Sequence, residues 1–110
     1  MNWFSKVLGG ADRAAELPWP DEALVVDVRS PAEYQSGHVE GALNLPLNEL
    51  PRLADSRLPD KSRPLVLYCQ SGMRSESARQ YLQSCGYSRL FNGRSPGAVA
   101  LRLQKPIVRH

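Results

Sequence analysis

Two short apolar runs constrain the fold of this chain more than any other feature of its sequence. They are ALVVDV at residues 23–28 and LVLYC at residues 65–69, and turn-forming residues bound both. Runs of this length and composition are typical of strands buried on both faces of a parallel sheet. Helix-forming sequence follows each run. We therefore expect an α/β domain with a small, mostly parallel central sheet and helices on both faces.

The first run is followed by a strong helix start. Ser30 can cap a helix, Pro31 suits its first position and Glu33 completes a capping box, while Gly37 can end the helix after about two turns. Ser95-Pro96 repeats the cap-then-proline pattern. The other expected elements are a short extended piece at 42–45, a helix opening at Asn48, a helix over 75–85, a very short strand at 89–91 and a last helix after Ser95.

Length and composition favour one domain. The chain has 110 residues, of which 42% are hydrophobic, which is enough for one packed core. We expect this domain to span residues 21–104, between an N-terminal helical lead (1–20) and a C-terminal tail (105–110).

The charge of the chain, its apolar segments and its ligand spacing argue against several classes of partner. The 14 Lys and Arg residues are scattered and the net charge is only +3, so we expect no nucleic-acid partner. The lead lacks the apolar run of a secretory signal and no segment resembles a membrane span, so we expect no membrane partner and a cytoplasmic location with reduced thiols. His, Cys and Asp residues show no metal-ligand spacing. We predict neither a metal nor a cofactor.

Cys69 ends the second buried run and is the candidate nucleophile. The segment Cys69-Gln70-Ser71-Gly72-Met73-Arg74-Ser75 leads from it into a helix. A loop of this kind can turn its backbone amides toward the sulfur, with Gly72 supplying a positive φ and Arg74 a fixed charge. Both effects favour the reactive thiolate. The alternative is an inert, buried cysteine, which is our interpretation of Cys85 on the apolar face of the following helix; a resolving-thiol role for Cys85 has little support.

Three further polar residues lie where they could be taken for catalytic groups. Asp27 and Arg29 flank the end of the first strand, where a local ion pair or cap is the favoured interpretation, and Arg29 can add positive potential near the pocket. His38 could be a general base, but its place in a Gly-His-Val turn favours a hydrogen-bonded structural histidine.

Two ordered signatures make residues 20–95 resemble the rhodanese family. The first is DVRSPAEYQSGHVEGALNLP (27–46), and the second is LVLYCQSGMRSESA (65–78). In the first signature Val39 and Leu45 replace the usual isoleucines. The residues that match it are Asp27, Arg29, Glu33, Tyr34, Gly37, His38, Gly41, Ala42, Asn44 and Pro46.

The resemblance implies a sulfurtransferase. Cys69 would take a sulfane sulfur from thiosulfate or a protein persulfide and pass it to a thiol or a cyanide-like acceptor. Arg74 would orient the anionic donor. The amides that would cradle the persulfide belong to Gln70, Ser71, Gly72, Met73, Arg74 and Ser75.

One segment departs from the family pattern. Rhodaneses usually show Gly-Gly after the last short strand and a tryptophan a few residues later. Here the segment is FNGRSPGAVALRLQ, in which Arg94 stands at the second glycine and no tryptophan follows. We expect this departure from the family pattern to affect which sulfur donor and which acceptor the protein prefers.

Two other functions stay open from the sequence, and the second of them, a non-enzymatic module, has a variant that carries sulfur. Cysteine phosphatases and arsenate reductases of the same fold have five residues between cysteine and arginine, whereas this loop has four, which suits a single sulfur atom better than phosphate. A non-enzymatic binding module needs neither Cys69 nor Arg74. A carrier that exchanges persulfide sulfur between proteins would share Cys69 with the enzyme.

Overall fold

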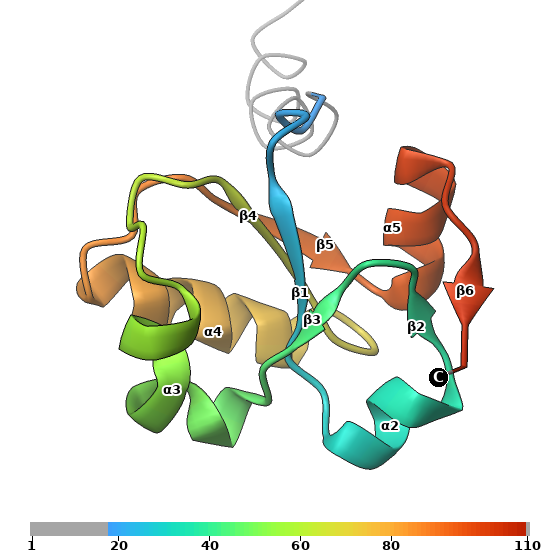
Figure 1. The fold of residues 1–110 in the computed structure, drawn as a ribbon, viewed down its shortest axis with the longest axis horizontal. Helices are drawn as coiled ribbons and strands as arrows, with labels where there is room; N and C mark the ends of the chain where they lie inside the picture. Colours follow the sequence, from blue (N-terminus) through green and yellow to red (C-terminus); the bar gives the residue numbers. More distant parts are fainter. Residues whose placement is uncertain (1–17, 110) are drawn as a thin grey trace, which may run out of the picture.

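The computed structural model describes residues 18–109, and the expected N-terminal helix falls almost wholly outside them. Four parallel strands form the central sheet in the order β3-β1-β4-β5 (Figure 1). The α/β prediction is therefore confirmed. The strands are β1 (Leu24–Asp27), β3 (Leu43–Asn44), β4 (Leu65–Tyr68) and β5 (Leu90–Arg94).

Helices cover both faces of this sheet. Helices α3 and α4 lie on one side, and α5 lies on the other with the short strands β2 and β6 (Figure 1). The bounds are α2 (Pro31–Ser36), β2 (His38–Val39), the 3-10 turn η1 (Leu47–Glu49), α3 (Leu50–Arg57), α4 (Met73–Ser84), α5 (Pro96–Leu103) and β6 (Ile107–Val108).

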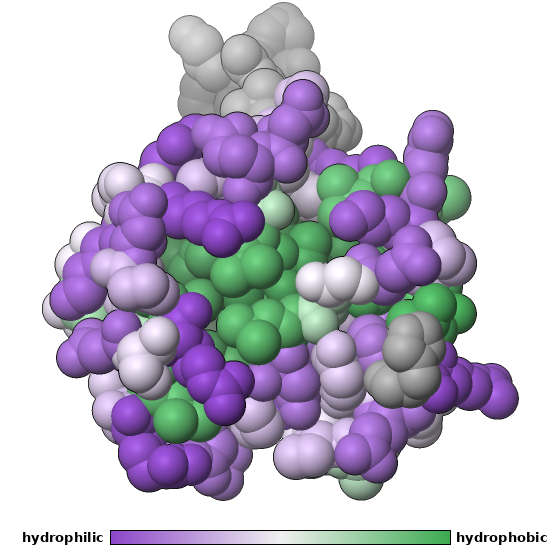
Figure 2. Space-filling model, viewed as in Figure 1, coloured by the Kyte–Doolittle hydropathy of each residue, from purple (hydrophilic) through white to green (hydrophobic). Residues whose placement is uncertain are grey.

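Alternate residues of the strands supply two separate apolar cores, as the pleat of a strand requires. Val26, Leu67 and Cys69 pack toward α3 and α4, whereas Val25 and Val66 pack toward α5. Polar side chains cover most of the surface in Figure 2, but apolar surface is visible over the edge of the sheet at β1 and β3.

Local signals account for the helix starts. The Ser30 Oγ accepts the Glu33 amide at 3.2 Å, and the Glu33 carboxylate accepts the Ser30 amide at 3.0 Å, which is the predicted capping box. The Ser95 Oγ likewise accepts the Ala98 amide. Asn48, in contrast, lies inside the 3-10 turn and does not cap α3. The helix expected over 75–85 begins at Met73, directly after Gly72 in the left-handed region.

The C-terminal segment contains a strand that the sequence did not suggest. Strand β6 pairs antiparallel with β2, so that His38 lies opposite Val108, and the Glu40 amide donates to the Pro106 carbonyl at 3.0 Å. A two-residue strand formed by pairing across the chain leaves no periodic pattern to recognise.

Candidate active site

The site is built where the parallel strands end. Arg29 follows β1, Cys69 follows β4, and Asn92 and Arg94 lie at the end of β5. The carboxyl ends of parallel strands meet at one edge, where ligands of open α/β sheets bind. The Cys69 thiol therefore lies at the edge of the sheet where a ligand would bind.

The Cys69 thiol lies beneath the loop that follows it. The residue is only 1% exposed. The Gly72 amide donates to its sulfur at 3.0 Å, and the Ser75 Oγ is 3.5 Å away. Burial alone raises the pKa of Cys69, but the Ser75 hydroxyl and the amides of Ser75, Gly72 and Ser71 outweigh it and lower the pKa to about 7. About half of the thiol is therefore ionised near neutral pH.

The loop keeps this shape through Gly72 and Asn92. Gly72 has a φ of 101°, a conformation that side chains with a Cβ disfavour. From β5, the Asn92 amide group donates to the Gly72 carbonyl at 3.1 Å, and its oxygen accepts the Ser75 hydroxyl at 2.7 Å and the Arg94 amide at 2.9 Å. No local sequence pattern marks Asn92, because its role depends on β5 lying beside β4.

Arg74 does not point its guanidinium freely at the thiol. Its two terminal nitrogens donate to the Glu33 carboxylate at 2.7 and 2.9 Å, and the Arg74 hydrogen bond is the main cause that lowers the pKa of Glu33 to about 2. The pair ties α2 to the loop. The groups that lower the Cys69 pKa most are hydrogen-bond donors rather than this arginine.

Asp27 and Arg29 form the predicted local ion pair. Both residues are buried, and the Arg29 guanidinium donates to Asp27 Oδ2 and to the Gly37 carbonyl, each at 2.7 Å. A longer contact of 3.4 Å reaches the Gln70 side chain. Arg29 therefore braces the base of the loop, and the prediction of a local pair is confirmed.

His38 is a buried structural residue. Its Nδ1 is 2.7 Å from the Tyr34 carbonyl, and its ring stacks on that of Tyr34 with centroids 3.6 Å apart. The structural interpretation is confirmed.

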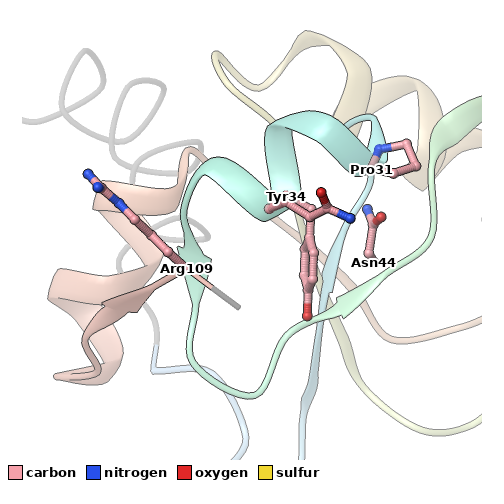
Figure 3. Close-up of a pocket in the computed structure, with 5 residues that line it drawn as sticks. Pro31, Tyr34, Asn44 and Arg109 are labelled. Atoms are coloured by element: carbon pink, nitrogen blue, oxygen red, sulfur yellow. The ribbon is translucent and has the colours of Figure 1, made fainter.

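Tyr34 also borders a cavity of about 600 Å³ with Asn44 and Arg109. In Figure 3 the Arg109 side chain points away from Tyr34 and Asn44. None of the five residues that line this cavity belongs to the Cys69 loop.

Comparisons with known proteins agree with this geometry. Residues 10–94 match the family described as Rhodanese-like domain. The chain belongs to the rhodanese family. It is 39% identical over 67 residues to thiosulfate sulfurtransferase PspE of Escherichia coli K12, covering 61% of this chain and 64% of PspE. It is also 41% identical over 88 residues to a sulfurtransferase of Allochromatium vinosum, covering 80% of each chain.

A solved structure shows the same fold. A rhodanese with anions from E. coli aligns with a TM-score of 0.72 and 33% identity, over 80% of this chain and 99% of that one. The relatives named sulfurtransferase share 39–41% identity with most of the chain. The predicted family and the predicted enzyme class, sulfurtransferase, are thus confirmed.

The structure shows why positions 93 and 94, where rhodaneses usually have two glycines, favour that residue. A Cβ on Gly93 would lie 2.5 Å from a methyl group of Val99 and 2.9 Å from one of Val66, so the first position must be glycine for close packing. Arg94, at the second position, has a φ of 77°. That position favours glycine for its backbone conformation.

Cys85 lies far from the thiol site of this rhodanese domain. It follows α4, whose 12 residues separate it from the Cys69 loop by roughly 18 Å of helix, too far for a direct disulfide. It packs against the core, as predicted, and both cysteines are free.

Across residues 18–109, no helix is long and apolar enough to cross a membrane. The same residues hold no cluster of three or more potential metal ligands.

Proposed function

We propose that the protein transfers a sulfane sulfur from thiosulfate or a persulfide donor to a thiophilic acceptor through a persulfide on Cys69. The observation that carries the proposal is the geometry around the Cys69 sulfur, which accepts the Gly72 amide at 3.0 Å and lies 3.5 Å from the Ser75 hydroxyl. These donors lower the pKa of the thiol to about 7. A thiolate at neutral pH is the nucleophile that the chemistry needs. The PspE relative is named for thiosulfate, which makes thiosulfate the first donor to test.

The reaction has two displacement steps. The Cys69 thiolate attacks the outer sulfur of thiosulfate, so that a new S–S bond forms, the S–S bond of thiosulfate breaks and sulfite leaves with the electron pair. An acceptor thiolate or cyanide then attacks the outer sulfur of the persulfide, and Cys69 leaves as a thiolate. Two such steps give ping-pong kinetics, and neither requires a metal or a cofactor.

The loop residues have separate parts in this proposal. The amides of Ser71, Gly72 and Ser75 hold the charge on sulfur, while the exposed side chains of Gln70 and Met73 border the loop from outside. Met73 is 78% exposed. Arg74 adds positive charge beside Cys69 and helps to orient the anionic donor.

Two observations disfavour the alternative functions. Four residues separate Cys69 from Arg74, and the Gly72 amide already contacts the sulfur, which leaves the loop narrow for a phosphate. A lowered thiol pKa has no use in a purely structural module. A protein-to-protein sulfur carrier would use the same persulfide, and a cytoplasmic location fits either role.

The test is the mass of the intact protein after incubation with thiosulfate, for wild type, Cys69→Ser and Cys85→Ala. We expect wild type and Cys85→Ala to gain the mass of one sulfur atom and Cys69→Ser to gain none. A gain in Cys69→Ser would refute the proposed nucleophile. If no protein gains sulfur from thiosulfate, the same measurement with a persulfide donor decides between a carrier and a binding module.

A further inference from the structure

Arg94 is a charged residue at this site that no charged group among residues 18–109 pairs with. It is exposed at the end of β5 and lines a cavity of about 470 Å³ with Ser71, Gly72, Met73, Glu76 and Asn92. A Cβ on Gly72 would lie 3.5 Å from the Arg94 Cγ. The Arg94 side chain thus runs along the residue whose amide holds the Cys69 sulfur.

The other cations near the thiol are already paired. Arg29 is bound to Asp27 and Arg74 to Glu33. Within residues 18–109, the Arg94 guanidinium makes neither a hydrogen bond nor an ion pair.

Among the described residues that line the cavity, Glu76 carries the carboxylate, and that carboxylate is already paired. Glu76 accepts hydrogen bonds from the side chains of Arg79, Gln80 and Asn92. Its charge is balanced by Arg79 at 2.6 Å. Among the described residues, the positive charge that an anion entering the cavity would meet without a paired carboxylate is therefore that of Arg94.

The backbone conformation of Arg94 also favours a functional role for its side chain. Its φ of 77° is a conformation that arginine adopts at a cost and glycine adopts freely. Strain of this kind concentrates at functional sites. The Arg94 carbonyl accepts a hydrogen bond from the Cys69 amide at 3.1 Å. The strained residue is therefore hydrogen-bonded directly to the residue that bears the nucleophile.

We propose that Arg94 binds the negatively charged oxygens of a small sulfur donor, the sulfonate end of thiosulfate, and so determines donor specificity. The inference rests on the proposed sulfur transfer and adds a recognition residue outside the Cys69 loop. The guanidinium stabilises the donor while it is bound and the sulfite as it leaves with the electron pair of the broken S–S bond. Donors with more negative charge at the end that leaves gain more from it.

The kinetic test compares Arg94→Gln and Arg94→Lys with Arg89→Gln. Arg89 is a matched control because it precedes the same strand at its other end, beside Glu22, roughly 16 Å from Arg94 along the strand. For thiosulfate, we expect Arg94→Gln to lower kcat/KM about tenfold, or about 1.4 kcal/mol. Arg94→Lys should recover most of this loss, and Arg89→Gln should behave as wild type.

The donor charge sharpens the prediction. An aryl thiosulfonate carries one negative charge where thiosulfate carries two, and Coulomb energy is proportional to charge, so its loss in Arg94→Gln should be roughly threefold. Salt should also depress the wild-type rate with thiosulfate more than that of Arg94→Gln. Equal losses for both donors, or no loss for thiosulfate, would overturn the inference.

A binding measurement separates this inference from the proposed reaction. Sulfite is titrated calorimetrically into Cys69→Ser and into the double variant Cys69→Ser/Arg94→Gln, neither of which can turn over. We expect about tenfold weaker binding to the double variant. Equal affinity, or no binding to either protein, would show that Arg94 does not hold the anion, whatever the mass experiment says of Cys69.

Discussion

Replacing Ser75 by alanine tests how the loop activates the thiol. The Ser75 hydroxyl lies 3.5 Å from the Cys69 sulfur and is the largest of the groups that bring the Cys69 pKa from its ordinary 9.0 to about 7. A hydrogen bond to a charged group contributes about 1.5–3 kcal/mol, and one pKa unit corresponds to about 1.36 kcal/mol. Because the contact is long and its proton is shared with Asn92, we expect the smaller effect, a rise of about one unit.

The consequence depends on pH in a definite direction. Raising the Cys69 pKa from about 7 to about 8 lowers the thiolate fraction at pH 7 from about one half to about one tenth. The rate of sulfur loading at pH 7 should fall about fivefold in Ser75→Ala. At pH values well above both pKa values the two proteins should load at similar rates, since both are then thiolates.

The assay is the pH dependence of Cys69 alkylation by iodoacetamide in a Cys85→Ala background, which leaves one thiol to titrate. Ser84→Ala is the matched control, because Ser84 lies at the other end of the same helix and its hydroxyl donates to the Tyr81 carbonyl. An unchanged midpoint in Ser75→Ala would mean that the backbone amides alone set the thiol pKa, and the reasoning above would be wrong.

Four further substitutions test the surrounding structure. Gly93→Ala should destabilise the fold by about 2 kcal/mol through the clash with Val99, a loss of roughly 10 °C in Tm by calorimetry; an unchanged Tm would show that the site can relax. Arg94→Gly should raise Tm by roughly 4 °C by removing about 1 kcal/mol of strain at φ 77°, and a lower Tm would contradict the strain. Arg74→Ala should lower kcat/KM for thiosulfate while Glu33→Gln does not, because Glu33→Gln leaves the arginine charge in place; equal losses in the two variants would restrict the ion pair to holding the loop.

Local signals in the sequence were sufficient for much of the site. The capping box at Ser30 and the buried run before Cys69 each depend on a few neighbouring residues, so both could be predicted without the fold. The four-residue spacing to Arg74 was visible as well. These features place a cysteine at the end of a parallel strand and a helix start after it.

The features of the site that could not be predicted from the sequence depend on contacts between distant segments. Asn92 reaches the loop only because β5 pairs with β4, and nothing in its own neighbourhood marks it. The sequence indicated that Arg74 carries a fixed positive charge, but it did not indicate the ion pair with Glu33, which α2 brings to Arg74 from 41 residues away. Arg94 was visible as a departure from the family pattern, whereas the absence of a carboxylate paired with its guanidinium among residues 18–109 depends on the fold.

Ser75 and Asn92 also explain how one loop can hold the thiol and the thiolate. A serine hydroxyl has one proton and can donate it to only one acceptor. When Cys69 is protonated, the Ser75 proton goes to Asn92 Oδ1 at 2.7 Å and the thiol can donate to Ser75. When Cys69 is ionised, that proton can turn to the sulfur, and Asn92 Oδ1 still accepts the Arg94 amide at 2.9 Å. No polar atom of the network loses its last partner in either state, so ionisation of the buried sulfur avoids the penalty of an unsatisfied group.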